Sequence, residues 1–398
     1  MQTILVINAG SSSIKYQLIE PATGERLAKG LVERIGESDG RVIHHSASGR
    51  EESLQLPIPD HEAGFSAMIE AFGRVGAPIE AFGIAAVGHR VVQGGSQFVA
   101  PTLIDDEVAE RILALGDLAP LHNPGEYQGI VAAREMFSDV PHVAVFDTAF
   151  HQSMPPEAYT YAIDAGTAEY RGVRRYGFHG TSYQVVSQRT ADFLDRPLES
   201  LRQIVLHLGN GASACAIDGG RSVDTSMGFT PLEGLVMGTR GGDIDPGALL
   251  HLMRGGYSVD DLDRLLNNRS GLLGLSGSND MRDVASAADR GDAAAKLAFA
   301  VYVHRIHHYL GAYLVLLGGT DAIVFTAGVG ENQALVRARA CEALGWLGVR
   351  LDPERNEADS REARRISADD SSIEVLVVPT DEEAEIARQT WELASIGG

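Results

Sequence analysis

Three side chains with catalytic potential stand where a ligand could reach them. Asp147 directly follows a short apolar run, and carboxylates at the ends of strands in α/β sheets often lie at a ligand site. The alternative role for Asp147 is that of a helix N-cap. His179 is flanked by glycines, and Arg240 lies between small residues in the long irregular stretch 224–246. A planar guanidinium in such a place can grip carboxylate or phosphoryl oxygens, so the pattern favours chemistry on an anion.

Three glycine-rich turns could bring backbone N–H groups close to phosphate oxygens. They are residues 8–13, 209–213 and 328–332. None matches the Walker pattern GxxxxGK[ST] or the dinucleotide pattern GxGxxG, and a single turn of this kind is more often only a turn. Three of them in one chain favour phosphate binding. His122 stands in a further turn, 118–124, where the alternative is a helix cap with a passing histidine.

Strand and helix patterns alternate along the chain, which predicts an α/β architecture. Short apolar or alternating runs predict strands at 4–7, 13–19, 84–92, 142–146, 204–208, 214–217, 322–326 and 374–378. The first two strands are joined by residues 8–12 and are expected to form a hairpin. The pattern Asn-x-Gly-Ser of residues 8–11 returns as Asn-Gly-x-Ser at 210–213. This weak internal repeat of strand, turn and strand precedes each half of the chain.

Helical patterns accompany these strands. Helices are predicted at 124–137 with Asn123 as N-cap, at 333–344 after the turn 328–332, and at 381–393 with Thr380 as N-cap. Apolar residues at helical spacing from Ile306 to Leu317 predict a further helix that faces the core. The highly charged segment 350–366 is expected to be exposed.

Length, charge and composition exclude several classes of function. The chain has 398 residues, which predicts about two domains. Its formal charge is −21, and so acidic a surface repels nucleic acid and anionic membranes. Two cysteines cannot form a disulfide framework or a structural zinc site, which fits a reducing cytosol. The N-terminal residues do not resemble a signal peptide and the apolar run 310–319 is too short to span a membrane, so we expect a cytoplasmic protein.

The chain resembles the acetate kinase family throughout its length. The resemblance rests on segments that occur in the order found in the family: 8–13 (NAGSSS), 88–92 (GHRVV), 119–124 (APLHNP), 146–151 (FDTAFH), 176–181 (YGFHGT), 207–213 (HLGNGAS), 224–246, 328–332 (GVGEN) and 380–383 (TDEE). Two places depart from the family. Tyr183 stands where many members have histidine, outside the groups expected to act in transfer, and residues 277–280 differ in the expected adenosine region.

This resemblance implies a fold and a reaction. The fold is α/β, with two related α/β domains of the sugar kinase and actin-like (ribonuclease H-like) type flanking a nucleotide cleft. The first domain is expected at 1–149 plus a C-terminal helix at about 381–398, and the second at 150–380. The reaction is the reversible, direct in-line transfer of the γ-phosphoryl group of ATP to acetate, giving acetyl phosphate and ADP. The family also implies a homodimer, formed mainly through the second domain.

The resemblance also assigns roles to single residues. The catalytic positions are Asp147, Arg240, His179 and Arg90. Acetate is already ionised and needs no strong general base, so the roles implied for Asp147 are to orient an arginine and to support the metal. Asn8 and Glu382 match positions associated with Mg²⁺, for which Mn²⁺ can substitute.

Nucleotide and acceptor positions follow from the same resemblance. The nucleotide positions are Lys15, Ser11, Ser13, His207, Leu208, Gly209, Asn210, Gly211, Asp280, Met281, Arg282, Gly328, Val329, Gly330, Glu331 and Asn332. The acceptor positions are Arg90, Val92, Leu121, His122, Phe178 and Pro231. A kinase for propionate or another short-chain fatty acid is the alternative, because the sequence does not measure the volume of this pocket. An actin- or chaperone-like nucleotide-binding protein that transfers nothing is the second alternative, against which the four catalytic positions argue.

Overall fold

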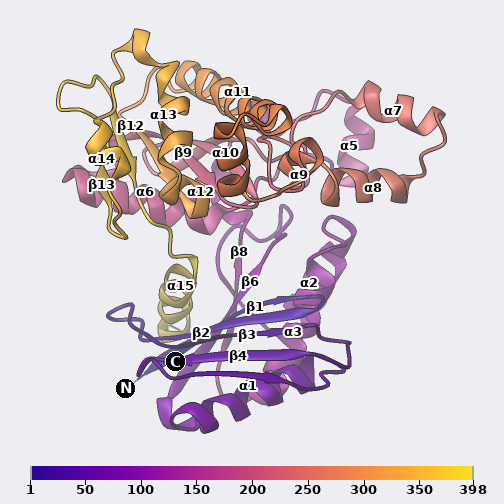
Figure 1. Cartoon of the computed structure of the whole chain (residues 1–398). Helices are drawn as coiled ribbons and strands as arrows, with labels where there is room; N and C mark the ends of the chain where they lie inside the picture. Colours follow the sequence, from indigo (N-terminus) through magenta and orange to yellow (C-terminus); the bar gives the residue numbers. More distant parts are fainter. Residues whose placement is uncertain (1, 397–398) are drawn as a thin grey trace. The chain divides into compact units, whose positions relative to one another are not determined.

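The chain folds into two compact units. The first comprises Met1–Ala149 together with Asp381–Gly398, and the second comprises Phe150–Thr380. The computed structural model describes residues 2–396 (Figure 1). Met1 and Gly397–Gly398, which the expected first domain includes, lie outside the described residues. Within residues 2–396, no helix combines the length and the apolar character that crossing a bilayer requires.

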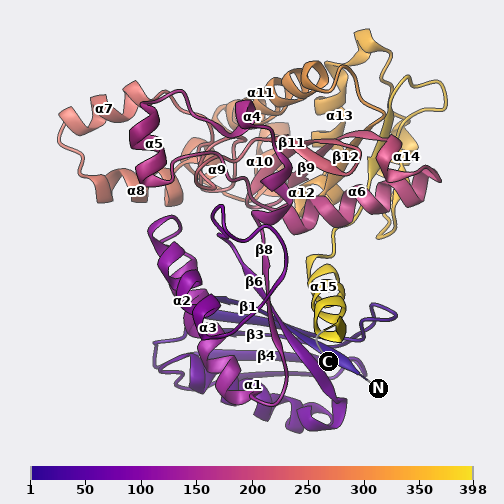
Figure 2. The same ribbon diagram turned by 180° about the vertical axis from the view of Figure 1, so that it is seen from behind.

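The first unit is built on a mixed sheet with helices on both faces. The strand order is β5 (Glu51–Gln55), β4 (Arg41–Ser46), β3 (Arg26–Glu33), β2 (Ser13–Ile19), β1 (Thr3–Gly10), β6 (Ile84–Val91), β8 (His142–Phe146) and β7 (Thr102–Leu103). The helices are α1 (His61–Val75), α2 (Asp106–Ala114), α3 (Asn123–Met136) and α15 (Glu382–Ile396). Alternation along β1 sends Leu5 and Ile7 into a core with α1 and α3, whereas Ile4 and Val6 pack beneath α15 (Figures 1 and 2).

The second unit is built in the same way. Its strand order is β11 (Arg221–Thr225), β10 (Ala212–Asp218), β9 (Arg202–Leu208), β12 (Ala322–Thr326), β14 (Glu374–Val377) and β13 (Arg364–Arg365). Its helices are α4 (Pro156–Tyr159), α5 (Ala165–Arg171), α6 (Gly180–Leu194), α7 (Pro246–Arg254), α8 (Val259–Asn268), α9 (Gly271–Ser276), α10 (Met281–Asp289), α11 (Ala293–Leu316), α12 (Ala327–Asn332), α13 (Ala334–Glu342) and α14 (Pro353–Glu357). Val205 packs with α6, and its neighbours Ile204 and Leu206 are equally buried, so both faces of β9 are covered.

The two sheets share one topology. In the order β3–β2–β1–β6–β8–β7, two antiparallel pairings are followed by two parallel ones and an antiparallel edge. The order β11–β10–β9–β12–β14–β13 repeats this pattern of directions. The α/β architecture and the repeat of strand, turn and strand are therefore confirmed. The two asparagines of the repeat are not equivalent, however: Asn8 pairs with Lys15 inside the first hairpin, whereas Asn210 lies in the turn between β9 and β10.

Several predicted boundaries are wrong, and the reasons are local. The first hairpin turns only at Ser11 and Ser12, because residues 8–10 continue β1 and pair with β2. Residues 328–332 are not an open turn but belong to helix α12, and α13 follows it with only Gln333 between them. In the charged segment 350–366, most residues are exposed as expected, but Asn356 and Ile366 are buried.

The two predicted caps are also wrong. The buried side chain of Asn123 donates from Nδ2 to the carbonyl oxygens of Gln93 and Ile112, so it ties loops together rather than capping α3. Helix α15 is capped by Asp381, whose Oδ1 accepts the N–H of Ala384 at 3.1 Å. Thr380 instead bonds through Oγ1 to Ser182. In both cases a polar group from a distant part of the chain binds the side chain that the local pattern had marked as the cap.

The two cysteines are unpaired and buried. Cys215 is 0% exposed and Cys341 is 3% exposed. Burial raises the pKa of the Cys341 thiol to about 12, and it raises that of Cys215 as well. Both side chains therefore behave as small core residues.

Candidate active site

Half-buried Arg90 and buried Asp147 form an ion pair at the ends of two adjacent parallel strands of the first unit. Arg90 lies near the end of β6, and Asp147 directly follows β8. Nη2 of Arg90 is 2.5 Å from Oδ2 of Asp147, and Nε is 3.3 Å from Oδ1. Asp147 is 1% exposed, and its carboxylate is engaged by Arg90 rather than by a helix end. This side-on pairing uses Nε and Nη2 and directs the remaining Nη1 away from Asp147.

Two more carboxyl groups surround Arg90. Oε2 of Glu382 is 3.8 Å from Nε of Arg90. Glu126 is 3% exposed, and both of its oxygens lie 3.1–3.2 Å from the N–H of Val92, which donates to them. Burial raises the pKa of Glu126 to about 8 and that of Glu382 to about 7. Although burial alone lowers the pKa of Arg90, the nearby carboxylates of Asp147 and Glu382 raise it overall, so the guanidinium stays charged.

Sequence reasoning missed Glu126. The signal was available, because this carboxylate lies in the first turn of α3, directly after the segment 119–124 that carries His122. Glu126, Glu382 and Asp147 together place three carboxyl groups around one guanidinium. Such an excess of acidic groups is unfavourable in a buried place unless a proton or a cation joins them.

In the second unit, His179 is held in an unusual backbone conformation at the start of α6. Its φ angle is 57°, in the left-handed region that residues with a Cβ atom seldom adopt. Its ring stacks on that of His207, with centroids 4.1 Å apart and planes 14° apart. Nδ1 of His179 lies 2.8 Å from Oγ of Ser213, and Nδ1 of His207 lies 2.8 Å from Oγ of Ser182. These contacts fix the planes of both imidazoles, as a site of catalysis requires.

Arg240 reaches the same place from a different segment. A Cβ atom on Gly211 would lie 2.9 Å from Nη2 of Arg240 and 3.5 Å from Nε2 of His179, so glycine leaves the room that both groups occupy. Nη1 of Arg240 donates to the carbonyl oxygen of Pro231 at 2.8 Å. Within residues 2–396, no carboxylate forms an ion pair with Arg240, and burial lowers its pKa. A half-buried cation in this state is suited to an anionic ligand.

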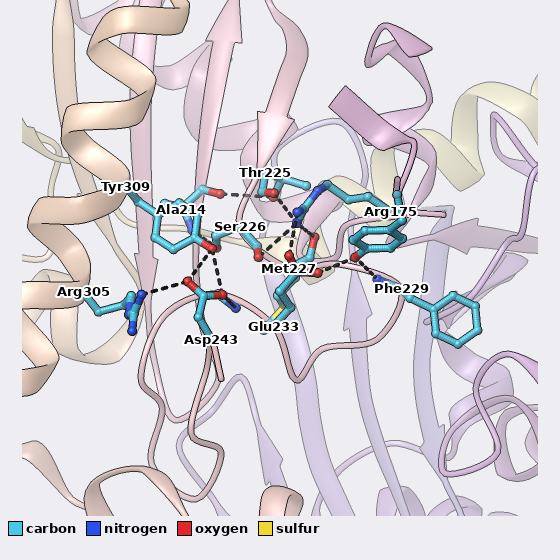
Figure 3. A network of polar contacts seen from close by, with 12 residues as sticks. Arg175, Ala214, Thr225, Ser226, Met227, Phe229, Glu233, Asp243, Arg305 and Tyr309 are labelled. Carbon is cyan, nitrogen blue, oxygen red and sulfur yellow. Dashed lines mark hydrogen bonds and ion pairs between the residues drawn. The ribbon is translucent and has the colours of Figure 1, made fainter. Parts of the chain in front are cut away.

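The irregular stretch that carries Arg240 is held by partly buried polar contacts (Figure 3). Nη1 of Arg175 donates to three successive carbonyl oxygens, those of Thr225, Ser226 and Met227, at 3.0–3.2 Å. Nη2 of the same side chain donates to Oε1 of Glu233 at 2.7 Å. The Arg175 guanidinium thus holds the beginning of the stretch and links it to Glu233.

A second anchor lies at the far end of the stretch. Asp243 accepts the N–H of Gly234 at 2.8 Å, the hydroxyl of Tyr309 at 3.0 Å and Nη1 of Arg305 at 3.1 Å (Figure 3). Tyr309 and Arg305 belong to helix α11. In the sequence, Arg240 lies between the carbonyl groups bound by Arg175 and the contacts of Asp243. These two sets of contacts explain how a stretch without helical or strand periodicity can hold one side chain in a fixed position.

Many predicted nucleotide positions line one pocket of the second unit. Its volume is about 490 Å³, and its lining comprises Gly209, Asn210, Leu272, Asn279, Asp280, Met281, Arg282, Tyr302, Gly328, Val329, Asn332 and Gln333. This volume falls within the range of small-molecule sites. The predicted positions His207, Leu208, Gly211, Gly330 and Glu331 are not part of the lining.

Two acidic members of that prediction have structural partners. Asp280 caps α10 through the N–H of Arg282 at 2.8 Å and also pairs with the Arg282 side chain. Oε1 of Glu331 accepts the N–H of Ala327 at 2.9 Å and that of Thr380 at 3.3 Å. Glu331 therefore braces the start of α12, where Ala327 has a φ of 64°. Asp280 lines the pocket, whereas Glu331 lies outside its lining, and the partners of both carboxylates belong to the fold.

Asn8 and Lys15 line a pocket of the first unit. Its volume is about 250 Å³, and Glu383, from the first turn of α15, also lines it. The neighbouring turn at Ser11 packs closely on α3, because a Cβ atom on Gly125 would lie 2.5 Å from the backbone nitrogen of Ser11. Ser13 is the first residue of β2.

The predicted acceptor positions are distributed over both units. Val92, Leu121 and His122 belong to the first unit, and Phe178 and Pro231 to the second. Val92 and Phe178 are buried, whereas Leu121 is 58% exposed. His122 stands at the start of α3 without a side-chain cap bond, and the carbonyl of Pro231 holds Arg240. Their grouping around a methyl group stays a prediction.

The sequence as a whole matches one protein family and its named members. The model of the Acetokinase family matches residues 3–388. A protein of Leifsonia xyli subsp. xyli named acetate kinase is 60% identical over 398 residues, covering all of both chains. An acetate kinase of Streptomyces coelicolor is 54% identical over 397 residues, covering 99% of this chain and 98% of that protein.

Solved structures give the same picture. The acetate kinase of Porphyromonas gingivalis superposes with a TM-score of 0.94 at 40% identity, covering 99% of this chain and 100% of that one. A propionate kinase of Francisella tularensis superposes with a TM-score of 0.92 at 39% identity, covering 98% of this chain and 100% of that one. These likenesses extend over both units described above.

Proposed function

On the premise that the chain belongs to the acetokinase family, we propose that it transfers the γ-phosphoryl group of ATP to acetate. The products are acetyl phosphate and ADP, and the reaction is reversible. A carboxylate oxygen of acetate forms the new bond to phosphorus, while the bond from phosphorus to the β–γ bridging oxygen breaks. The electron pair of that broken bond leaves on ADP, so no proton has to move.

The observation that carries this proposal is the side-on pairing of Arg90 with Asp147. Two anions must approach each other in this reaction, and their repulsion is the main obstacle. A half-buried guanidinium that a carboxylate orients, with Nη1 directed away from that carboxylate, can hold the carboxylate of acetate in one direction. Asp147 acts as the orienting residue and not as a base.

The second unit supplies donors for the phosphoryl group. The side chains of Arg240 and His179 approach each other over Gly211. Within residues 2–396, no carboxylate forms an ion pair with Arg240. In a loose transition state the charge spreads over the equatorial oxygens of the transferring group, where preorganised donors act most strongly. The pocket of about 490 Å³ would take the nucleoside part of ATP.

The donor set of the first unit fits Mg²⁺. Among residues 2–396 there is no group of three or more His, Cys, Asp or Glu side chains arranged to hold a metal. Mg²⁺ usually keeps several waters and binds through one or two protein oxygens and the phosphates, so few ligands are needed. Asn8 and Glu382 would hold it. Burial raises the pKa of Glu382 to about 7, and a bound cation would favour the charged form of this carboxyl group. When bound, the ion would neutralise charge on the phosphates.

A hydroxylamine assay tests this function. With ATP and Mg²⁺, the protein should produce acetyl hydroxamate only when acetate is present, in step with ADP. Hydrolysis of ATP that does not depend on acetate and gives no hydroxamate would instead favour a nucleotide-binding protein without transfer.

A propionate kinase is the second candidate, and one observation favours keeping it. The Francisella tularensis structure titled as a propionate kinase is nearly as similar to this chain, at 39% identity, as the acetate kinase structure of Porphyromonas gingivalis, at 40%. The same assay with propionate and butyrate separates the two. A kcat/KM for propionate equal to or above that for acetate would reassign the substrate.

We further propose a cytoplasmic homodimer. Exposed apolar side chains of the second unit, among them Leu250, Met253 and Val259 of α7 and α8, offer surface for such a contact. Light scattering should give twice the chain mass of 42.5 kDa, and a species of 42.5 kDa alone at low concentration would exclude the dimer.

A further inference from the structure

A buried chain of hydroxyl groups ends on the ring of His179. The hydroxyl of Tyr183, one turn further along α6, lies 2.5 Å from Oγ of Ser213. Oγ of Ser213 lies 2.8 Å from Nδ1 of His179. Tyr183 and Ser213 are both 0% exposed. From the sequence, Tyr183 is expected to lie outside the groups that act in transfer.

The partners of this chain determine which way its hydrogen bonds run. Within residues 2–396, the Tyr183 hydroxyl has Ser213 as its hydrogen-bond partner and no other acceptor, and burial raises its pKa well above the ordinary value. Tyr183 therefore donates to Ser213. Oγ of Ser213 could accept from both Tyr183 and Nδ1 of His179, but its own buried proton would then have no acceptor within residues 2–396, so Ser213 donates to Nδ1. The reverse direction would leave the Tyr183 proton buried without an acceptor, which is unfavourable.

This direction fixes the tautomer of His179. An Nδ1 atom that accepts a hydrogen bond carries no proton, so a neutral imidazole carries its proton on Nε2. Nε2 is also the atom that faces the space above Gly211, at 3.5 Å from where a Cβ atom would stand, beside Nη2 of Arg240. The donor proton thus lies on the side of the ring that adjoins the arginine.

We propose that Tyr183 is a positioning residue, which acts through Ser213 to hold His179 as the Nε2–H tautomer. The role of that proton, donation to an equatorial oxygen of the transferring phosphoryl group, rests on the proposed function. The tautomer itself does not, because it follows from contacts within the second unit. Tyr183 touches no substrate and acts only through the serine.

Tyr183→Phe tests the proposal with the loss of one oxygen atom. Without the tyrosine donor, the Ser213 hydroxyl can either donate to or accept from Nδ1, and both tautomers become populated. We expect kcat to fall about 2- to 10-fold, the scale of one neutral hydrogen bond, with the KM values for ATP and acetate unchanged. Tyr313→Phe is the matched control, because Tyr313 is a buried tyrosine of the same unit whose hydroxyl has no partner within residues 2–396.

Two further measurements separate this role from a merely structural one. In ¹⁵N spectra of histidine-labelled protein, assigned with His179→Gln, the wild type should show the Nε2–H form and Tyr183→Phe a mixture. Ser213→Ala should lower kcat at least as much, and the double variant should be no worse than Ser213→Ala, because tyrosine acts through serine. An Nδ1–H signal in the wild type, an unchanged kcat in Tyr183→Phe, or additive losses would each overturn the proposal. A wild type that shows the Nε2–H form but forms no acyl phosphate would refute the proposed function and leave the positioning role standing.

Discussion

The burial of Arg240 is unfavourable for its positive charge. The side chain is held by the carbonyl of Pro231, while burial lowers its pKa and no carboxylate within residues 2–396 pairs with it. A group kept in this state is better explained by a ligand than by the stability of the fold, because an unpaired buried cation is destabilising.

Arg240→Ala should therefore lower kcat about 10²- to 10³-fold, the scale for one preorganised donor to a transition state. The melting temperature should not fall. Arg240→Lys should recover little activity, since a point charge does not reproduce the planar fork. Near-normal turnover in a folded Arg240→Ala protein would exclude Arg240 from the site.

Glu126 gives the fold a dependence on pH. Its pKa is about 8 in the folded protein against 4.5 ordinarily, because of burial. Between these values the folded state holds a proton that the unfolded state has lost, so this group makes the protein less stable as the pH rises through that window.

Glu126→Gln removes this titration. Relative to wild type, the variant should gain stability on going from about pH 5 to about pH 9, by at most roughly 1.4 kcal/mol for each unit of pKa shift. Thermal unfolding at both pH values measures the difference. Glu107→Gln, at an exposed position on α2, is the control that should show no such trend. A difference in melting temperature between Glu126→Gln and wild type that does not vary with pH would contradict the raised pKa of Glu126.

A substitution of Val92 tests which residues line the predicted acceptor pocket. It is buried directly after β6, two residues beyond Arg90. If Arg90 holds the carboxylate end of the acid and Val92 meets the alkyl end, Val92→Ala should raise kcat/KM for propionate relative to acetate. One methylene corresponds to ~1–3 kcal/mol of discrimination, so a change of about tenfold is expected, mostly in KM. A ratio that does not rise in a stably folded variant would remove Val92 from the pocket.

Among the elements, the irregular stretch between Thr225 and Asp243 depends on tertiary contacts for its shape. Arg175 binds three of its carbonyl oxygens and Glu233, and burial of this guanidinium is offset by the Glu233 carboxylate, which raises its pKa. A segment held in this way should loosen as a unit when its central contact is removed.

Arg175→Lys should destabilise the second unit by about 3 kcal/mol, because lysine keeps the charge but cannot reach several carbonyls and a carboxylate at once. Hydrogen exchange of residues 226–245 should become faster, and kcat should fall as Arg240 loses its fixed place. Arg264→Lys, in an exposed pair with Asp261, should change stability by less than about 0.5 kcal/mol. Unchanged exchange in the stretch would mean that other contacts hold it.

The sequence predicted elements well where local pattern and burial agree. Strands 142–146 and 322–326 have the predicted bounds, since each is a continuous run of buried residues. The caps at Asn123 and Thr380 were wrong because partners distant in the chain bind those side chains. The pairing of Arg90 with Asp147 and the link from Tyr183 to His179 could not be read from the chain either, because strand pairing and tertiary packing bring these side chains together.

For the whole molecule, the proposed site residues are divided between the two units with repeated sheet topology. Arg90, proposed to hold the carboxylate of acetate, and the proposed metal ligands lie in one unit, and the proposed phosphoryl donors and the larger pocket lie in the other. The expected convergence of both sets on one nucleotide stays a prediction, as do the expected domain boundaries.

Ligand binding should stabilise the protein by mass action. ATP with Mg²⁺ at about 100 times its Kd should add ~2.7 kcal/mol to the stability of any unit that binds it, and raise its melting temperature. Arg240→Ala should keep much of this shift, because the larger pocket that would take the nucleoside does not include Arg240. A melting temperature that does not respond to nucleotide would argue against that pocket as the site.

The burial of both thiols has a practical consequence for spectroscopy. Cys215 and Cys341 are the chain's two cysteines, and both are enclosed with raised pKa values, so neither should react with a maleimide in the folded protein. Dyes could therefore be attached selectively to Ser48→Cys in the first unit and Ala358→Cys in the second, both exposed positions, without first removing the native cysteines. Energy transfer between the two dyes, followed while ATP, Mg²⁺ and acetate are added in turn, would report directly on movement of one unit against the other during a catalytic cycle.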